Sequence, residues 1–177
     1  AAMDRMGMAQ YLSRIGLLLD DNSGSSLVEA KQLWMTDAAW QPLRALCEKM
    51  LVTPDWFELL LVQTLLVDSH IGQLFYRHLD QWLSANQGRD VAMLTEFMQD
   101  CLQDVGNWSD SVIKQAAVES DANRAHLQQW LTQWQPQVAA AFAPLAQALL
   151  GVAAGQAAME AAASQIKQRQ TKLGLAA

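Results

Sequence analysis

The sequence has few of the residues from which most catalytic and metal sites are built. Its 177 residues include two cysteines and three histidines, and Lys and Arg number 12 against 18 Asp and Glu. Cys47 and Cys101 lie outside any Cys-x-x-Cys or metal-ligand spacing, so we expect reduced thiols in a cytosolic protein. A nucleic-acid surface needs a clustered basic face, which the net charge of −6 and the scattered basic residues do not supply. A glycine-rich phosphate loop is also missing.

Long hydrophobic runs are absent as well. The strongly apolar run at 59–67 is far shorter than the ~20 residues that span a membrane, and acidic residues bound it on both sides. The Ala-rich stretch at 138–163 is longer, but polar residues and a proline interrupt it. Asp4 and Arg5 interrupt any early apolar run, so no signal peptide is expected. These patterns predict no membrane span and a cytoplasmic location.

Strand patterns are missing, and helical patterns fill the chain. β-branched residues never alternate over a strand length, whereas Ala, Leu and Gln dominate. We predict an all-α fold with a single helical domain over residues 1–177. The predicted helices cover 2–19, 26 to 34 or 35, Thr36 or Asp37 to about 50, 54–83, 90–119, Ser120 or Asp121 to 135, and 136–173 with a kink near Pro144.

The pattern at 54–83 is the longest, and the rest of the chain is organised around it. Thr53 is its expected N-cap and Pro54 its first helical position. The helix would be about 45 Å long. Residues 59–67 are apolar on nearly every face, so other helices must surround them. The short loop at 85–89 predicts antiparallel packing against the next helix, which Asp90 would cap.

Carboxylates and histidines on long helices raise the possibility of a di-iron site. Such a site takes one Glu from each of two helices and a Glu-x-x-His pair from each of two others. No Glu-x-x-His occurs, because Val67, Phe75 and Asn123 stand three residues before the three histidines. His70 and His78 are separated by about 12 Å of helical rise, too far to share one ion. We expect no metal, cofactor or catalytic residue in this chain.

Two other polar groups are candidate sites. Glu58 lies in an apolar setting that could raise its pKa, but no carboxylate or His follows at i+3 or i+4. A structural salt bridge with Arg44 is therefore predicted instead. Asp68, Ser69 and His70 are adjacent, and neighbours one residue apart on a helix do not face each other, so no triad follows.

Seven tryptophans are the strongest positive signal. Core packing accounts for most of them, but Trp is rarely fully buried and is enriched at protein interfaces. One interpretation is a subunit with large contacts to other chains. The alternative is a free-standing helical protein-interaction or ligand-binding module that uses a Trp-rich surface, including the ridge LQQWLTQWQPQ.

Five segments in order carry a resemblance to a known family: AMDRMGMAQYLSRIGLLLD, AKQLWMTDAAWQPLRALCE, TPDWFELLLVQTLLVD, DVAMLTEFM and DANRAHLQQWLTQWQP. They resemble the β subunit of bacterial multicomponent (di-iron) monooxygenases, most closely the L or P1 component of phenol hydroxylase. The resemblance covers residues 2–175. The family's β subunit has about as much chain again on the N-terminal side, including two bundle helices, so the match is to its C-terminal half.

The resemblance implies a ferritin-like helical bundle, here lacking its N-terminal helices. It implies a non-catalytic, iron-free structural subunit that supports the di-iron α subunit and the (αβγ)2 dimer of an NADH-dependent phenol or aromatic monooxygenase. The implied partners are the α and γ subunits, a second β subunit and the effector protein. The cofactors would lie elsewhere, with di-iron in α and NADH, flavin and an Fe–S centre in the reductase.

The resemblance also assigns a set of motif positions to structure and subunit contact: Trp40, Gln41, Arg44, Asp55, Trp56, Glu58, Asn123, Arg124, Trp130 and Trp134. Thr64 departs from the family, which usually has Asn there, and so does SHIGQL at 69–74. With two bundle helices missing, we expect the helix at 54–83 to expose an apolar face larger than a monomer normally shows.

Overall fold

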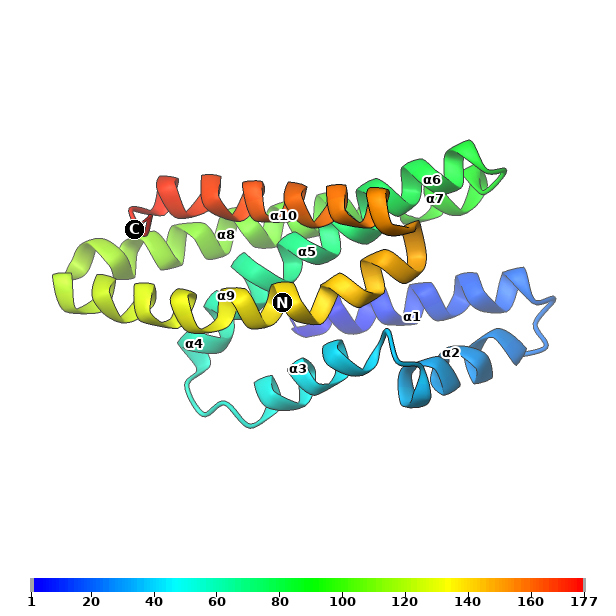
Figure 1. Cartoon of the computed structure of the whole chain (residues 1–177), viewed down its shortest axis with the longest axis horizontal. Coiled ribbons are helices and arrows are strands. Elements are labelled where there is room, and N and C mark those ends of the chain that lie inside the picture. The colour runs from blue at the N-terminus through cyan, green and yellow to red at the C-terminus, as the bar shows by residue number, and fades with distance from the viewer. Residues whose placement is uncertain (1, 177) are drawn as a thin grey trace.

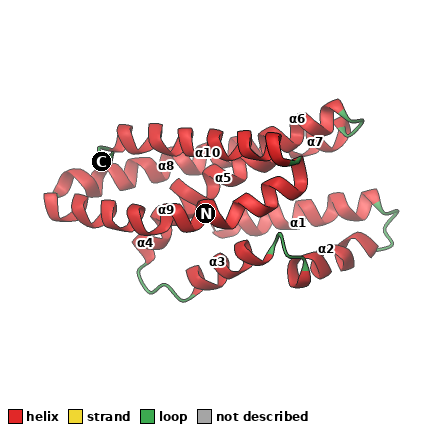
Figure 2. Cartoon of the chain, in the orientation of Figure 1, coloured by secondary structure: helices red, strands yellow, loops and turns green. Residues whose placement is uncertain are grey.

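Helices are the only regular elements between residues 2 and 176, the part of the chain that this computed structural model describes (Figure 2). No strand occurs in that range, which agrees with the all-α prediction. In chain order the elements are α1 (Ala2–Leu19), α2 (Ser25–Thr36), α3 (Gln41–Leu51), α4 (Trp56–Leu61), η1 (Val62–Val67), α5 (Asp68–Gln73), η2 (Leu74–Leu79), α6 (Asp80–Ala85), α7 (Arg89–Thr95), α8 (Phe97–Glu119), α9 (Asp121–Leu150) and α10 (Val152–Leu173).

The elements from α4 to α6 are one continuous helix, which we call the central helix. It differs from the prediction in containing two π-helical turns, η1 and η2. It also begins later, at Trp56, because the side chain of Asp55 accepts hydrogen bonds from the amides of Phe57 (2.8 Å) and Glu58 (3.2 Å). Asp55 is therefore the N-cap, and the predicted N-cap Thr53 instead donates to the Lys49 carbonyl.

Three long helices, α8, α9 and α10, surround the central helix. In Figure 1, α9 and α10 run side by side, and the central helix passes obliquely behind them from α4 to α6. Figure 1 also shows α1 and α2 as a hairpin on the other side of α9 from α10. Apolar side chains from all four long elements form the main core: Leu61, Val62, Leu65, Leu66, Ile113, Leu127, Trp134, Val138, Phe142, Leu145 and Ile166.

A smaller cluster joins α1 to the bundle. Met8 packs with Tyr76 of the central helix and Met98 of α8. The ring of Tyr11 meets that of Phe97 edge to face, with 4.9 Å between the ring centroids. These contacts position α1 across the middle of the central helix.

The prediction that Pro136 ends a helix is wrong. Pro136 and Pro144 both lie inside α9, which runs for 30 residues. A proline in a helix interior removes one backbone hydrogen bond, and the cost is about 3 kcal/mol. Buried side chains on either side of Pro136, including Trp134, Val138 and Phe142, offset that cost through their packing.

Three predicted helix starts also need correction. The Ser26–Glu29 capping box does not form, because the backbone amide and hydroxyl of Ser26 both donate to Asp20 (2.9 and 2.8 Å). The helix expected from Thr36 begins at α3 instead, after a turn at 37–40. The helix expected from Asp90 is divided at Glu96 into α7 and α8. In contrast, Ser120 caps α9 as expected, and Gly174 ends α10 with φ of 72°.

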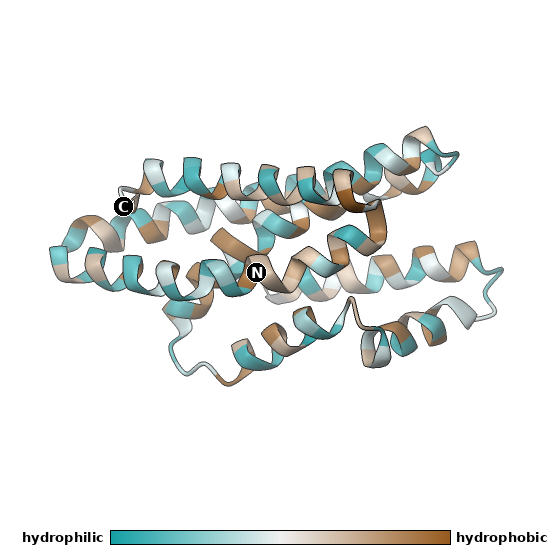
Figure 3. Ribbon diagram, viewed as in Figure 1, coloured by the Kyte–Doolittle hydropathy of each residue, from teal (hydrophilic) through white to brown (hydrophobic). Residues whose placement is uncertain are grey.

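The uncovered apolar face was expected on the central helix, and that prediction is wrong. Its side chains from Leu61 to Leu66 are almost fully buried, apart from that of Gln63. The segment from Trp56 to Ala85 is long and apolar enough to cross a membrane, but 61% of its most apolar window is buried inside the fold, as in the core helix of a bundle. Exposed apolar side chains lie on α1 and α2, at the end of α3 and the turn after it, and at Trp56, the first residue of the central helix: Met3, Met6, Leu18, Leu19, Val28, Leu51, Val52 and Trp56. Figure 3 shows hydrophobic residues along the ribbons of α1 and α2.

Gly155 marks the closest approach of α9 and α10. A Cβ atom there would lie 2.7 Å from both the carbonyl carbon and oxygen of Ala146. We expect Gly155→Ala to lower the free energy of unfolding by about 2 kcal/mol, because the two backbones must separate. Gly7 lies on an exposed face of α1, where a Cβ atom would meet nothing within 4 Å, and is the matched control.

Gly7→Ala should stabilise the chain by up to about 1 kcal/mol through helix propensity alone. Urea denaturation of both variants measures the difference. Equal effects at the two positions would contradict the close contact between α9 and α10.

Candidate functional site

Three successive polar residues of the central helix are buried inside the bundle. Asp68, Ser69 and His70 have exposed fractions of 6%, 2% and 2%. Successive residues of a helix point about 100° apart, so each one meets a different neighbour. Asp68 contacts α1, Ser69 contacts α10 and His70 contacts α9. This segment is where polar chemistry would have to occur.

Asp68 forms an ion pair with Arg5 of α1. Its carboxylate also accepts a hydrogen bond from the Gln63 carboxamide at 2.8 Å. Burial raises the pKa of Asp68, and the nearby Arg5, Gln63 and Arg169 oppose that rise. The Asp68 carboxylate is therefore already paired with side chains of the same chain.

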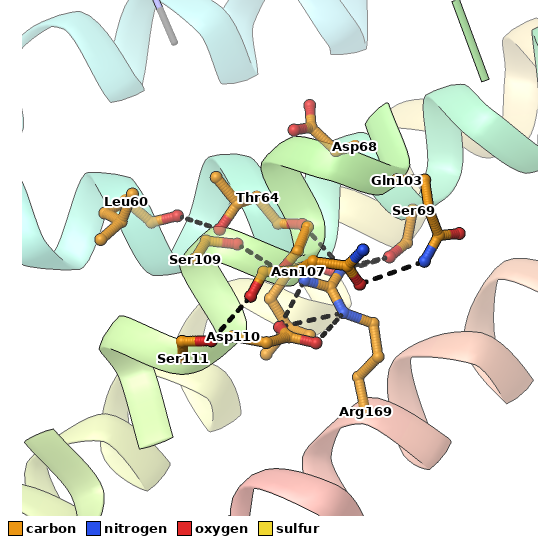
Figure 4. A network of polar contacts seen from close by, with 12 residues as sticks. Leu60, Thr64, Asp68, Ser69, Gln103, Asn107, Ser109, Asp110, Ser111 and Arg169 are labelled. Atoms are coloured by element: carbon orange, nitrogen blue, oxygen red, sulfur yellow. Dashed lines mark hydrogen bonds and ion pairs between the residues drawn. The ribbon is translucent and has the colours of Figure 1, made fainter. Parts of the chain in front are cut away.

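Arg169 of α10 forms a second pair, partly buried, with Asp110 of α8 (Figure 4). Its Nε lies 3.2 Å from both carboxylate oxygens, and its Nη2 lies 2.6 Å from Oδ1. Its Nη1 reaches the central helix and donates to the Thr64 carbonyl (2.7 Å) and the Ser69 hydroxyl (3.2 Å). One guanidinium therefore joins three helices.

The sequence gives no sign of this pair. Arg169 is one of several cationic residues near a helix C-terminus, and nothing in the pattern of α8 distinguishes Asp110. The two residues are 59 positions apart, so no helical spacing relates them. Only the packing of α10 against α8 reveals the contact.

His70 is buried and contacts two other groups of the fold. Its Nδ1 lies 2.8 Å from the Leu66 carbonyl, and its ring stacks on Phe142 with 5.1 Å between centroids. Burial lowers the pKa of His70, so the ring is neutral at pH 7 and Nδ1–H donates to the carbonyl. His126 packs edge to face on Trp130.

A polar cavity of about 440 Å³ lies between the central helix, α8 and α10. Asp68, Ser69, Asp110 and Arg169 are among its lining residues. Across residues 2–176, no three His, Cys, Asp or Glu side chains lie together as a metal site requires. Three carboxylates line the cavity, and two of them, Asp68 and Asp110, are each paired with an arginine. With Asp100 as the remaining carboxylate, this donor set does not fit a di-iron centre.

Glu58 does not pair with Arg44, so that prediction is wrong. Glu58 accepts a hydrogen bond of 2.5 Å from the indole N–H of Trp134, which is 1% exposed. Lys49 lies over the same indole ring, 4.8 Å from its centroid. Arg44 instead pairs with Glu48 at 3.0 Å on its own helix, because the two residues are four positions apart on α3.

The motif positions up to the start of the central helix have contacts within the chain. The ring of Trp40 lies between those of Trp34 and Phe75, at 6.1 and 6.5 Å. The Gln41 carboxamide donates to the carbonyl of Trp34 in α2 and to that of Asp37 in the following turn, each at 3.1 Å. The ring of Trp56 meets that of Phe57 edge to face at 5.2 Å, and Trp56 is 69% exposed.

Two motif positions lie in the first turn of α9, and two others, Trp130 and Trp134, lie further along the helix. Asn123 donates to the Ala116 carbonyl at 3.2 Å and so joins the start of α9 to the end of α8. Arg124 pairs with Asp121 at 3.1 Å on the surface. Trp130 is half-buried. Contact of these residues with other subunits stays a prediction.

The fold and the paired polar interior define the class of protein, a ferritin-like helical bundle. Residues 1–121 match the methane/phenol/alkene hydroxylase family, and the chain belongs to that family. The resemblance found in the sequence is thereby confirmed.

Individual relatives cover nearly the whole chain. It is 53% identical over 175 residues to the phenol 2-monooxygenase oxygenase component MhpL of Acinetobacter pittii (strain PHEA-2), covering 99% of this chain and 52% of that protein. Identity to the oxygenase component DmpL of Pseudomonas sp. (strain CF600) is 47%, over 98% of this chain and 51% of DmpL.

A solved structure shares the fold. A chain of xenon-pressurized phenol hydroxylase from Pseudomonas sp. OX1 matches with a TM-score of 0.92 and 42% identity, over 99% of this chain and 52% of that chain. The chain thus spans about half the length of the relatives it matches.

Proposed function

We propose that this chain serves as a non-catalytic, iron-free structural subunit in the hydroxylase component of an NADH-dependent phenol or aromatic monooxygenase. Its relatives are named as oxygenase components of phenol 2-monooxygenases. Family membership favours this role over a free-standing binding module. The observation that carries the proposal is the pairing of two of the three cavity carboxylates, Asp68 and Asp110, with arginines, which leaves Asp100 as the third.

The physical argument is that arginine side chains compete with a metal ion for the same carboxylates. A metal ligand must present a free lone pair, and a di-iron site needs several carboxylates and histidines converging on one point. Here Arg5 and Arg169 already occupy the carboxylates, and their charge repels a further cation. His70 directs Nδ1–H at a backbone carbonyl and stacks on Phe142. These groups stabilise the bundle, and within residues 2–176 no cluster of three His, Cys, Asp or Glu side chains accompanies them, which supports the proposal.

The remaining partners follow from the same role. The catalytic di-iron would belong to an α subunit, and a γ subunit, a second β subunit and the effector protein would complete the contacts. NADH, flavin and the Fe–S centre would belong to a reductase. A cytoplasmic location is part of the proposal. Exposed Trp56 and the apolar side chains of α1 and α2 are the surfaces available to partner chains.

Iron analysis tests the proposal. The assembled oxygenase is purified with Asp68→Asn or Asp110→Asn in this chain and compared with wild type. We expect the iron content per complex to stay unchanged in both variants, because neither carboxylate binds iron. Stoichiometric iron in this chain after its separation from the other subunits, lost in either variant, would overturn the proposal.

A further inference from the structure

Two π-turns interrupt the central helix, η1 at Val62–Val67 and η2 at Leu74–Leu79. At the end of η1, the Asp68 amide donates to the Gln63 carbonyl five residues back, where an α-helix would use the fourth. Each π-turn therefore inserts about one residue into the α-helical path, which is a rotation of about 100° for everything that follows. π-turns are rare, so these two need interactions that favour them.

A side chain from another helix donates to a carbonyl inside each π-turn. Arg169 of α10 donates to the Thr64 carbonyl in η1 at 2.7 Å. Gln99 of α8 donates to the Tyr76 carbonyl in η2. The two turns are thus supported in the same way from two different helices.

Side chains of the central helix itself add further donors around η1. The Thr64 hydroxyl donates to the Leu60 carbonyl at 2.7 Å, and the Ser69 hydroxyl to the Leu65 carbonyl at 2.8 Å. His70 Nδ1 does the same to the Leu66 carbonyl. The backbone hydrogen bonds of a widened turn are less well aligned, and these side-chain donors give its carbonyls additional hydrogen bonds.

We infer that Arg169 and Gln99 are positioning residues that hold the central helix in its π-containing register, so that movement of α10 or α8 is coupled to rotation of the central helix. The register decides which residue meets which neighbour. Asp68 now meets Arg5, Ser69 meets Arg169 and His70 meets Phe142. A shift by one residue would break all three contacts together.

Asp110 orients the Arg169 guanidinium for its contact with η1. Its carboxylate binds two nitrogens of Arg169 and leaves Nη1 directed at Thr64 and Ser69. Arg169 therefore has two separable roles, an ion pair with α8 and a hydrogen bond to η1. Variants that remove one role or both distinguish the register function from simple ion pairing.

Amide hydrogen exchange on the full chain, purified with whatever subunits accompany it, tests the first π-turn. Arg169→Met should speed exchange in the peptides covering 64–70 by about tenfold or more, because η1 loses a charge-assisted hydrogen bond. Asp110→Asn, which removes the ion pair but keeps the guanidinium, should change the same peptides by less than about threefold. Equal acceleration in the two variants, or none in Arg169→Met, would overturn the inference.

The second π-turn supplies a test that does not depend on a buried charge. Gln99→Met should speed exchange selectively at 76–80 by about fivefold or more, since the Tyr76 carbonyl loses its donor. Gln103→Met is the matched control, because Gln103 is also exposed on α8 and donates to Asn107 of the same helix. If Arg169→Met fails to fold, the Gln99 and Gln103 pair decides alone, and equal exchange at 76–80 in both variants would refute the inference.

Discussion

Replacing Trp134 with alanine is expected to lower the free energy of unfolding by about 3–5 kcal/mol, as for other fully buried tryptophans. The indole is 1% exposed, and its removal leaves a cavity in the centre of the main core. It also removes the N–H donor that Glu58 accepts at 2.5 Å and the ring beneath Lys49. The lost packing and the lost polar contacts therefore both lower the free energy of unfolding.

Urea denaturation followed by circular dichroism measures this loss. Trp108→Ala is the matched control, because Trp108 lies on α8 with an exposed fraction of 54%. The control should cost less than about 1 kcal/mol, as surface substitutions do. Similar losses for the two variants would contradict the position assigned to Trp134.

Replacing Arg5 with methionine should cost about 3 kcal/mol at pH 7, the low end for removing one partner of a buried ion pair. Asp68 would keep only the Gln63 carboxamide as a close hydrogen-bond donor. The substitution should also weaken the attachment of α1 to the bundle, which would then depend on the Met8 cluster and the Tyr11–Phe97 ring contact.

The loss in Arg5→Met should depend on pH. The pKa of Asp68 in the fold already lies above its ordinary value of 3.8, because burial outweighs its partners. A carboxyl with a raised folded pKa contributes stability that is present below the unfolded pKa and lost as pH rises through the folded pKa. Removal of Arg5 raises that pKa further, so the destabilisation should grow as pH rises above about 4 and shrink in acid.

Denaturation midpoints across a range from about pH 4 to about pH 8 check this result, with Arg5→Met/Asp68→Asn as the control. The double variant has no charge at position 68, so it should be more stable than Arg5→Met at pH 7 and lose its pH dependence. A loss in Arg5→Met that is constant with pH would show that Asp68 is not the affected group.

The fold was predictable to the extent that it depends on local sequence patterns. Apolar periodicity identified the helical segments but not the boundary between α9 and α10 at Gly151. The side chain of Ser120 and the positive φ of Gly174 acted as the expected caps. The prediction at Pro136 failed because the cost of a proline is local, whereas the burial that offsets it comes from other helices. The π-turns could not be predicted either, since the donors that support them, Arg169 and Gln99, belong to α10 and α8.

The interior polar site was predictable only in outline. The missing Glu-x-x-His spacing argued against iron, and Asp68 and His70 were recognisable as polar residues on an apolar helix. Their partners were not, because Arg5 and Asp68 are 63 residues apart and no periodicity connects them. The error at Glu58 has the same cause, since a salt bridge was inferred from proximity in sequence and the true partner, Trp134, lies 76 residues away.

The paired interior also determines what electric field the bundle presents to a neighbouring chain. Two guanidinium groups and two carboxylates cancel within the helices, and His70 adds no charge at neutral pH. A charge a few ångströms inside a low-dielectric bundle would otherwise act strongly on ionisable groups across a subunit interface. In the proposed role as a subunit, a partner chain would experience dipoles from this interior instead of net charge.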